Sequence, residues 1–385
     1  MKKISILYLI DVFQGKAGAE GNLLQILTNI NQNQFEFLLY TFEYGPQMAS
    51  ILEQKNIKCV QIPYPKTLQA FKKFLSLSRE IRGQKIHILH SYFEGSDIWG
   101  TLLAKLAGIP VIISSKRDMG ISKNKRILMA YRLINLFVTK IIAVSEAVKH
   151  QVHLQEKVSL EKIITIYNGL DTDKFYNTNY NSTLKAELKL NASSPIVGVL
   201  ANIRPIKGIE YFIQAASKVV KQSPQTQFII VGGCVPGQKN VAYCDKLKLL
   251  VRELKLERNL FFLGQRTDIP DILSIMDISV LPSLSEGFSN TVIESMAAGK
   301  PLVVTDVGGN SEAVANGESG FVVPPQDSDK LADAISTLLN NKELAKRMGE
   351  VGRMKAKQLF SIDTMIDKIE NLYVTLLDHK NRSIN

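Results

Sequence analysis

The sequence is poor in cysteine and has no long apolar run, and both absences narrow what the protein can be. Its three cysteines, Cys59, Cys234 and Cys244, have neither metal-site spacing nor a disulfide framework, so we expect free thiols in a reducing compartment, the cytoplasm. No apolar run approaches the roughly 20 residues of a membrane-spanning helix. Asp11 cuts short the apolar run that follows Lys3, so we expect a first strand and not a signal peptide.

Acidic residues are scarce in the first part of the chain. Residues 1–166 contain 22 Lys and Arg against 12 Asp and Glu, about +10, whereas residues 167–385 carry about +1. An excess of positive charge in one part of the chain indicates an anionic partner. Aromatic residues do not interleave the basic clusters as in a nucleic-acid groove. We therefore expect no nucleic acid, and favour a phosphate-bearing substrate or an anionic membrane with the protein peripheral on its inner face.

Short apolar runs alternate with helical patterns along most of the chain, which predicts an α/β fold with parallel sheets covered on both faces. A polar stretch at 171–194 interrupts the alternation, so we expect two doubly wound domains, 1–170 and 171–360. The predicted strands are 4–10, 36–42, 58–62, 87–92, 110–115, 140–145, 162–167, 196–200, 227–231, 260–263, 278–281, 302–305 and 321–323. The predicted helices include 20–31, 66–82, 97–107, 123–138, 146–156, 327–340, 342–359 and a last one from 362.

The stretch richest in chemistry is residues 279–309, SVLPSLSEGFSNTVIESMAAGKPLVVTDVGG, which predicts strand, loop, helix and strand. Its loop falls at the carboxyl edge of a parallel sheet, where open α/β folds bind ligands. Glu286 and Glu294 can accept hydrogen bonds from sugar hydroxyls. Amides at the helix start can hold a phosphate, and they belong to Phe288, Ser289 and Asn290. Alternatively, Thr291 and Glu294 form a capping box and Glu294 is structural.

A second strand–helix junction carries two cations, Arg204 and Lys207. Two cations three residues apart can embrace a pyrophosphate and stabilise the charge that develops on a leaving nucleoside diphosphate. The alternative is a pair of solvated surface charges. We find no Asp-x-Asp pair or histidine cluster suited to a metal ion, so we predict a site that uses neither metal nor another cofactor.

Together these motifs resemble the retaining glycosyltransferases of family 4. The resemblance rests on Glu286-Gly287-Phe288 with Glu294 eight residues on, on residues 297–301 (AAGKP), on Val307-Gly308-Gly309 and on the Arg/Lys pair. It implies the GT-B fold, two Rossmann-like domains facing a central cleft. It implies that the N-terminal domain binds the acceptor, that the C-terminal domain binds the nucleotide sugar, and that a C-terminal helix, 361–385, returns to the first domain.

The resemblance also implies residue roles. Glu286 would bind the donor sugar and steady positive character at its anomeric carbon, while Arg204 and Lys207 act on the diphosphate. Gly18 lies in a loop, Gly15 to Gly21, that is similar to the family's glycine loop except for Ala17. The residues that it assigns to the donor are Gly18, Gly232, Gln265, Arg266, Gly287, Phe288, Ser289, Asn290 and Glu294, the last for the ribose.

In the first domain, His87-Ile88-Leu89-His90-Ser91-Tyr92 ends a strand and resembles the family's His-x-His motif. We predict that His90 is catalytic and that Tyr92 and Arg117 contact the acceptor. The alternative for His90 is a buried, hydrogen-bonded histidine.

The helix predicted at 123–138 is amphipathic and basic. Its apolar side is formed by Ile127, Leu128, Tyr131, Ile134, Leu136 and Phe137, and Lys123, Lys125, Arg126 and Arg132 flank it. Such a helix can lie on an anionic membrane or can cover the sheet with its charges outward.

From this resemblance we predict that the protein is a hexosyltransferase of polysaccharide biosynthesis. It would move a sugar with retention from a UDP- or GDP-linked donor to a glycan or lipid-linked glycan. The alternatives are a nucleotide-sugar epimerase of the same fold, a glycan-binding module without activity, and an NAD-dependent oxidoreductase. The last rests on Gly15, Gly18 and Gly21, whose spacing is Gly-x-x-Gly-x-x-Gly and not the Gly-x-Gly-x-x-Gly of the dinucleotide fingerprint.

Overall fold

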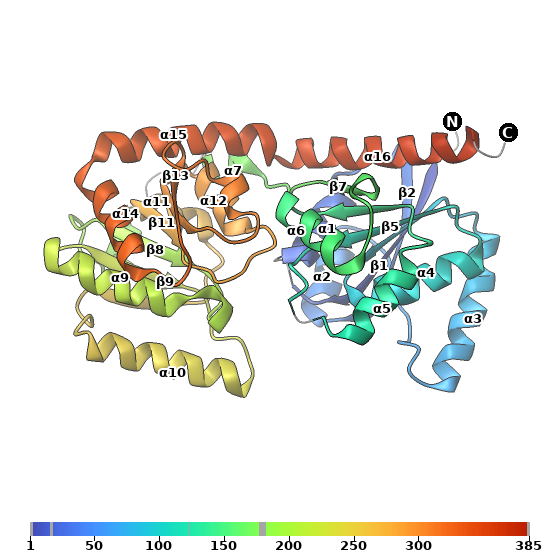
Figure 1. The fold of residues 1–385 in the computed structure, drawn as a ribbon, viewed down its shortest axis with the longest axis horizontal. Coiled ribbons are helices and arrows are strands. Elements are labelled where there is room, and N and C mark those ends of the chain that lie inside the picture. The colour runs from blue at the N-terminus through green and yellow to red at the C-terminus, as the bar shows by residue number, and fades with distance from the viewer. Residues whose placement is uncertain (1–2, 16–17, 122, 177–181, 383–385) are drawn as a thin grey trace. The chain divides into compact units, whose positions relative to one another are not determined.

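The computed structural model describes residues 3–15, 18–121, 123–176 and 182–382 (Figure 1). The chain divides into two compact units, which we call the N-terminal domain (residues 1–169 with 362–385) and the C-terminal domain (residues 170–361). The last helix therefore belongs to the N-terminal domain. Within the described ranges, no helix is both long enough and apolar enough to span a membrane.

The N-terminal domain is built on a parallel sheet of seven strands in the order β3-β2-β1-β4-β5-β6-β7. The strands are β1 (Ile4–Phe13), β2 (Phe35–Tyr44), β3 (Cys59–Gln61), β4 (Ile88–Tyr92), β5 (Val111–Lys116), β6 (Lys140–Ala143) and β7 (Ile163–Thr165). The helices are α1 (Gly18–Asn29), α2 (Pro46–Gln54), α3 (Leu68–Gly83), α4 (Glu94–Ala107), α5 (Lys125–Ile134), α6 (Glu146–Glu156) and α16 (Ile362–Arg382), with the short η1 (Leu160–Lys162). The strand order reverses between β1 and β4, which lie side by side.

Helix α16 contributes to the core of the N-terminal domain. Its Met365, Ile369 and Tyr373 are buried in the same cluster as strand residues Tyr8 and Ile88. The hydroxyls of Tyr8 and Tyr373 are 3.0 Å apart and hydrogen-bonded. Because residues at spacings of three and four put one apolar stripe on the sheet, the last 21-residue helix completes a domain whose other elements end near residue 169.

The C-terminal domain is built on a parallel sheet of six strands in the order β10-β9-β8-β11-β12-β13. The strands are β8 (Ile196–Leu200), β9 (Gln227–Val231), β10 (Leu260–Gly264), β11 (Ile278–Leu281), β12 (Leu302–Thr305) and β13 (Gly320–Val323). The helices are α7 (Thr172–Tyr176), α8 (Ser182–Glu187), α9 (Ile209–Gln222), α10 (Gln238–Glu253), α11 (Ile269–Ile275), α12 (Asn290–Ala297), α13 (Asn310–Ala313), α14 (Ser328–Asn340) and α15 (Lys342–Leu359), with the short η2 (Pro205–Lys207). Counted from β8, this is the doubly wound order 3-2-1-4-5-6 of Rossmann folds.

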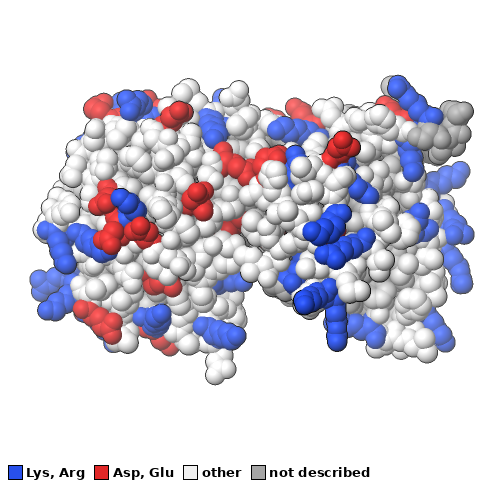
Figure 2. All heavy atoms as spheres, viewed as in Figure 1, with Lys and Arg blue, Asp and Glu red and all other residues white. Residues whose placement is uncertain are grey.

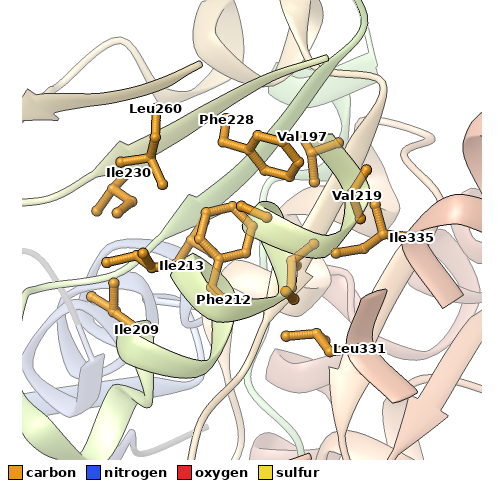
Figure 3. Close-up of a cluster of buried hydrophobic side chains, with 14 of the residues drawn as sticks. Val197, Ile209, Phe212, Ile213, Val219, Phe228, Ile230, Leu260, Leu331 and Ile335 are labelled. Atoms are coloured by element: carbon orange, nitrogen blue, oxygen red, sulfur yellow. The ribbon is translucent and has the colours of Figure 1, made fainter. Parts of the chain in front are cut away.

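The core beside the donor-side loops is formed by α9 on the sheet (Figure 3). Phe212 of α9 packs against Phe228 of β9 with their ring centroids 5.6 Å apart. Ile335 of α14 closes the cluster. Each such side chain contributes roughly 1.5–3 kcal/mol on burial, so the strands that carry the candidate site are held on a rigid base.

The α/β prediction is confirmed, and the differences in its elements have local causes. Helix α2 was not predicted, because Pro46 at its start and the neighbouring glycine favour a turn in the sequence. Helix α4 begins at Glu94 and not near residue 97, and α5 ends at Ile134 and not at 138. The polar stretch at 171–194 holds α7 and α8 among its described residues.

The prediction of three free cysteines is wrong. Cys234, after β9, forms a disulfide with Cys244 of α10, and Cys59 is free. The two partners are only ten residues apart in sequence, and the turn from strand to helix brings them together. The inference of a reducing compartment from cysteine usage loses its basis with this bond.

Candidate active site

The two strand–loop junctions that the sequence singled out lie next to each other in the C-terminal domain. Strand β8 pairs with β11, and the chain then continues to opposite sides of the sheet. Loops that leave two adjacent strands in opposite directions open a crevice at the carboxyl edge, the switch point where doubly wound folds bind ligands. The loop at 201–208 and the loop at 282–289 therefore form one candidate site, although about 80 residues separate them.

The two loops meet in an ion pair. Lys207 Nζ lies 2.6 Å from Glu286 Oε1, and the Ser283 hydroxyl donates to the same oxygen at 2.7 Å. Both charged side chains are partly buried, so the pair is shielded from solvent more than a surface pair. Lys207 therefore presents a positive charge, and Glu286 a carboxylate, at fixed positions in the crevice.

Glycines lock these loops together. A Cβ on Gly208 would overlap with the carbonyl oxygen of Pro282, and one on Gly308 with that of Glu286. Both glycines have positive φ, +60° and +53°, which side chains disfavour. The Gly309 amide also donates to the Gly287 carbonyl at 3.1 Å. The glycines of the family-like motif thus permit the backbone contacts that hold Glu286.

Arg204 is the accessible cation of the site. It lies in extended backbone just before η2, and its side chain is exposed. Within the part of the chain that the structure describes, its guanidinium has no hydrogen-bond or ion-pair partner. A guanidinium without a partner beside a paired lysine is suited to a diphosphate.

Glu294 does not cap its helix, so the capping-box alternative is wrong. Helix α12 begins at Asn290 with Ser289 as its N-cap, and Thr291 lies inside the helix, where its hydroxyl donates to the Leu200 carbonyl at 3.1 Å. Burial raises the pKa of Glu294 to about 7, because the charge of Lys174, which lowers this pKa, offsets only part of the effect of burial. Glu294 makes no hydrogen bond or ion pair with any described residue, so the carboxyl is available to a ligand.

The raised pKa of Glu294 gives a stability test. We expect Glu294→Gln to stabilise the chain without ligand at pH 8, because the folded carboxyl ionises near pH 7 and the unfolded one near 4.5, so wild-type stability falls as pH rises between these values. Scanning calorimetry should show a gain of about 1–2 kcal/mol at pH 8 and almost none at pH 4. An equal difference at both pH values would contradict this origin.

The remaining donor-side residues contribute mainly backbone. Gly232 has φ +150° and its Cβ would overlap with the Ala201 carbonyl oxygen, so the strand end needs glycine. The Arg266 guanidinium is held by both carboxylate oxygens of Asp268, at 2.8 and 2.5 Å. Phe288 is buried and packs on Phe360, with ring centroids 5.2 Å apart. Gln265 is exposed, Ser289 is buried, and Asn290 is the first residue of α12.

The N-terminal domain has a pocket of its own at the corresponding edge, beside β1 and β4. Its volume is about 340 Å³. The residues that line it include Asp11, Glu94, Lys116, Arg117, Lys123 and Tyr131. Asp11 accepts hydrogen bonds from the amides of Gly95 and Ser96 at 2.8 and 2.5 Å, and so holds the start of α4. Phe93, which precedes α4, has φ +73°, a strained value that places Glu94 at the pocket.

Two of the three residues predicted to act here are not accessible. His90 is fully buried, with Nδ1 2.6 Å from the Tyr373 hydroxyl and Nε2 2.7 Å from the Ser115 hydroxyl. Burial, with a smaller effect of Arg117, lowers the pKa of His90 to about 3, so it is a neutral core residue and its predicted catalytic role is wrong. Tyr92 is equally buried, and burial raises its pKa to about 12, so it cannot contact an acceptor.

Arg117, by contrast, lines the pocket. Its guanidinium donates to Asn168 Oδ1, and burial lowers its pKa. Sequence reasoning missed Asp11 and Glu94. Asp11 lies near the carboxyl end of β1, and Glu94 comes two residues after the end of β4, so their positions close to two strand ends were the signal that could have found them.

The described part of the glycine loop leaves little room for a dinucleotide. The Glu20 carboxylate accepts hydrogen bonds from the Gln14 and Gly15 amides, both at 2.5 Å. A side-chain carboxylate thus occupies donors that a pyrophosphate would need. Gly18 begins α1 with φ +61°, and Ala17, the departure from the family loop, lies outside the described residues.

Comparison with known proteins agrees with this geometry. The model "Glycosyltransferase Family 4" matches residues 17–174, and the model "Glycosyl transferases group 1" matches residues 181–355. The chain is a family 4-like glycosyltransferase. It is an enzyme of GT-B fold that uses nucleotide-sugar donors, as predicted. The dehydrogenase alternative is therefore set aside.

Relatives of this glycosyltransferase cover more than nine-tenths of its length. It is 27% identical, over 98% of each chain, to the Escherichia coli UDP-Gal:alpha-D-GlcNAc-diphosphoundecaprenol alpha-1,3-galactosyltransferase. It is 26% identical to the Bacillus anthracis N-acetyl-alpha-D-glucosaminyl L-malate synthase over 92% of this chain and 85% of the relative. The crystal structure of Anabaena Alr3699/HepE with UDP-glucose is similar with a TM-score of 0.84 and 25% identity, over 97% of this chain and 100% of that one.

Proposed function

We propose that this glycosyltransferase transfers a hexose with retention, and without a metal ion, from a UDP-sugar to a hydroxyl of a glycan or lipid-linked glycan. The observation that carries the proposal is the Lys207–Glu286 pair at the switch point, together with Arg204, which lies three residues before Lys207 and has no partner among the described residues. The UDP-linked donor is supported by the UDP-glucose bound to the Anabaena protein and by the name of the Escherichia coli relative.

The residues of the C-terminal domain would divide the work. Arg204 and Lys207 would hold the diphosphate and neutralise the charge that grows on it as the bond to the sugar breaks, which is the role that a metal ion has in other enzymes. Glu286 would accept hydrogen bonds from sugar hydroxyls. Glu294, ionised on binding, would accept them from the ribose, and the Gly287 to Asn290 backbone would lie along the phosphates.

Retention would follow from the position of the charges. With the diphosphate held by two cations, the acceptor hydroxyl can attack the face that the diphosphate leaves, and its proton can pass to a phosphate oxygen. The bond from the anomeric carbon to the diphosphate breaks as the bond to the acceptor oxygen forms. Proton NMR of the product should show the anomeric configuration of the donor; an inverted product would contradict the retaining mechanism.

The acceptor would bind in the pocket of the N-terminal domain. Lys116 and Lys123 are neutralised there by Asp97 and Glu156, whereas Glu94 faces the pocket and burial raises its pKa. Carboxylate and hydroxyl groups suit sugar hydroxyls better than a bare phosphate. The Escherichia coli relative, named for a lipid-linked GlcNAc acceptor, supports a glycan on a lipid carrier.

Calorimetric titration with UDP, GDP and ADP in EDTA tests the donor site. We expect UDP to bind, and Arg204→Ala and Glu294→Ala each to weaken binding by about tenfold or more, because each removes a charged hydrogen-bond partner. Lys218→Ala, which removes a lysine paired with exposed Asp329 in the same domain, is the matched control and should bind as the wild type. Binding that requires a divalent metal would contradict metal independence. Conversion of a UDP-sugar to its epimer without acceptor would favour the epimerase.

A further inference from the structure

Helix α5 and the turn after it expose an apolar stripe. Met129, Leu133, Leu136 and Phe137 are between 50% and 75% exposed, at spacings of four, three and one. The opposite side of the same segment is buried through Tyr131 and Asn135. Leu136 and Phe137, expected to lie on the same apolar side as Tyr131, face solvent. The segment therefore has a second apolar face, which no described element covers.

Basic residues surround this stripe, and acidic ones are missing from its segment. Residues 119–145 contain five Lys and Arg and no Asp or Glu. Lys123 is paired with Glu156 and Lys140 donates to the Glu161 carbonyl, whereas Lys125, Arg126 and Arg132 are exposed. Lys105 of α4 stands 5.1 Å from the Phe137 ring. Figure 2 shows Lys and Arg side chains gathered over the part of this face where Figure 1 draws α5 and α6.

Of the partners that could cover an exposed apolar face, a lipid surface best fits an apolar stripe surrounded by basic residues. A second copy of the chain would bring two cationic rims together, which costs free energy. An anionic bilayer satisfies both features, because the aliphatic and aromatic side chains enter the interface while the cations meet lipid phosphates.

The same helix forms part of the acceptor pocket. Tyr131 lines the pocket and donates to Asp97 Oδ2 at 3.1 Å, and Lys123, just before α5, is 2.8 Å from Glu156. Gly120, also at the pocket, is followed by the exposed Ile121. The stripe and the pocket are thus on opposite sides of one short, well-anchored segment.

We propose that the outer face of Ile121 and of residues 123–137 docks on an anionic membrane and holds the N-terminal pocket next to acceptors that are anchored in that membrane. The docking surface is supported by the exposure of its apolar side chains and by the positive charge around them. Only the statement about acceptors rests on the proposed function.

Vesicle sedimentation tests the docking surface directly. The probes are vesicles of phosphatidylethanolamine with phosphatidylglycerol, and vesicles of phosphatidylcholine alone. We expect the wild type to bind the anionic vesicles, and Leu133→Gln/Leu136→Gln/Phe137→Gln to bind about tenfold or more weakly. Lys125→Glu/Arg126→Glu should also bind weakly, and its residual binding should lose its salt dependence.

Leu249→Gln/Met354→Gln is the control, since these two residues are 53% and 65% exposed on the C-terminal domain. It should bind vesicles as the wild type does. The proposal would be overturned if the wild-type protein did not bind anionic vesicles. It would also be overturned if the triple glutamine variant of Leu133, Leu136 and Phe137, the stripe variant, bound them as strongly as the wild type. A stripe variant that changes only the oligomeric state in analytical ultracentrifugation would overturn it too, and would assign the face to a second copy.

Activity then separates the two claims. The stripe variant should transfer sugar to a short-chain, water-soluble acceptor at the wild-type rate and lose about tenfold or more on a long-chain acceptor in vesicles. Equal loss on both acceptors would overturn the link between docking and acceptor. Vesicle binding by a wild type that transfers no sugar would contradict the proposed function and leave the docking surface supported.

Discussion

Replacement of Lys207 by alanine is expected to lower the rate of sugar transfer by about 10²–10³-fold, the usual cost of removing one preorganised charge from a transition state. Lys207 is held 2.6 Å from Glu286, and η2 is tied to the second loop through the Leu284 amide and the Ile206 carbonyl at 2.8 Å. The variant loses the cation for the leaving diphosphate and also leaves Glu286 without its counter-charge. Steady-state kinetics with the donor that calorimetry identifies measures the effect.

The comparison variants for this prediction separate chemistry from folding. Lys218→Ala should keep the wild-type rate, since Lys218 pairs with an exposed aspartate away from the crevice loops. Lys207→Arg keeps the charge with another shape and should recover part of the loss. If Lys207→Ala is folded by circular dichroism and retains more than about a fifth of the wild-type kcat, the assignment of this lysine to the leaving group is wrong.

Glu156→Ala is expected to destabilise the N-terminal domain by about 3–5 kcal/mol, the cost of removing one partner from a buried ion pair. Glu156 is buried, and its carboxylate lies 2.8 Å from Lys123 Nζ and 3.4 Å from Lys116 Nζ, while Asn135 donates to it at 2.8 Å. Burial alone would raise the pKa of Glu156, but the two lysines outweigh burial and hold it below its ordinary value. The variant would leave two cations in the interior with Asp97 as their remaining carboxylate.

The single tryptophan makes this measurement specific to one domain. Trp99 lies on α4 and packs against Tyr64 and Phe74, so urea unfolding followed by its fluorescence reports the N-terminal domain. Glu161→Ala, an exposed carboxylate five residues away, should change the free energy by less than about 0.5 kcal/mol. Because the folded pKa of Glu156 is depressed, its contribution should be present above about pH 4.5 and disappear as pH falls below that value. Equal stability of Glu156→Ala and wild type at pH 7 would refute the buried network.

Most elements were predictable because their periodicity is local. Strands such as Ile196–Leu200 and Leu302–Thr305 are short apolar runs between turn residues, and a strand buried on both faces has that composition wherever it lies in the sheet. The crevice residues were predictable for a related reason. Arg204, Lys207 and Glu286 lie in loops that follow strands, and strand ends meet at one edge of a parallel sheet.

His90 shows where local information fails. Its strand pattern indicates a residue at the edge of a sheet, and the motif resembles one with a reactive histidine. It is a core residue because Tyr373, 283 positions later in the chain, covers it through α16. Exposure of a strand residue depends on the element that packs over it, and a distant helix leaves no trace in the strand's own sequence.

Helix α5 and Glu294 also show that the local sequence does not reveal which other segments a residue contacts. A helical pattern with apolar residues on two sides does not say which side meets the sheet, and here Tyr131 was drawn inward by Asp97 and Lys116 while Leu133 stayed outside. The Thr291 to Glu294 spacing is that of a capping box, but the helix begins at Asn290, because the Leu200 carbonyl of a neighbouring strand takes the Thr291 hydroxyl.

The class of fold, the two doubly wound sheets, the family resemblance and the charged residues of the donor loops could all be predicted from the sequence, because each depends on local periodicity or on motifs within about 30 residues. Packing of the folded chain was needed to show that Lys207 pairs with Glu286, that Cys234 bonds to Cys244, that His90 is buried and that the outer face of α5 is exposed. The first three are contacts between different segments of the chain, and the last is a helix face that no other described segment covers. They follow from strand order and from which helix covers which surface, and both are settled only when the whole chain packs.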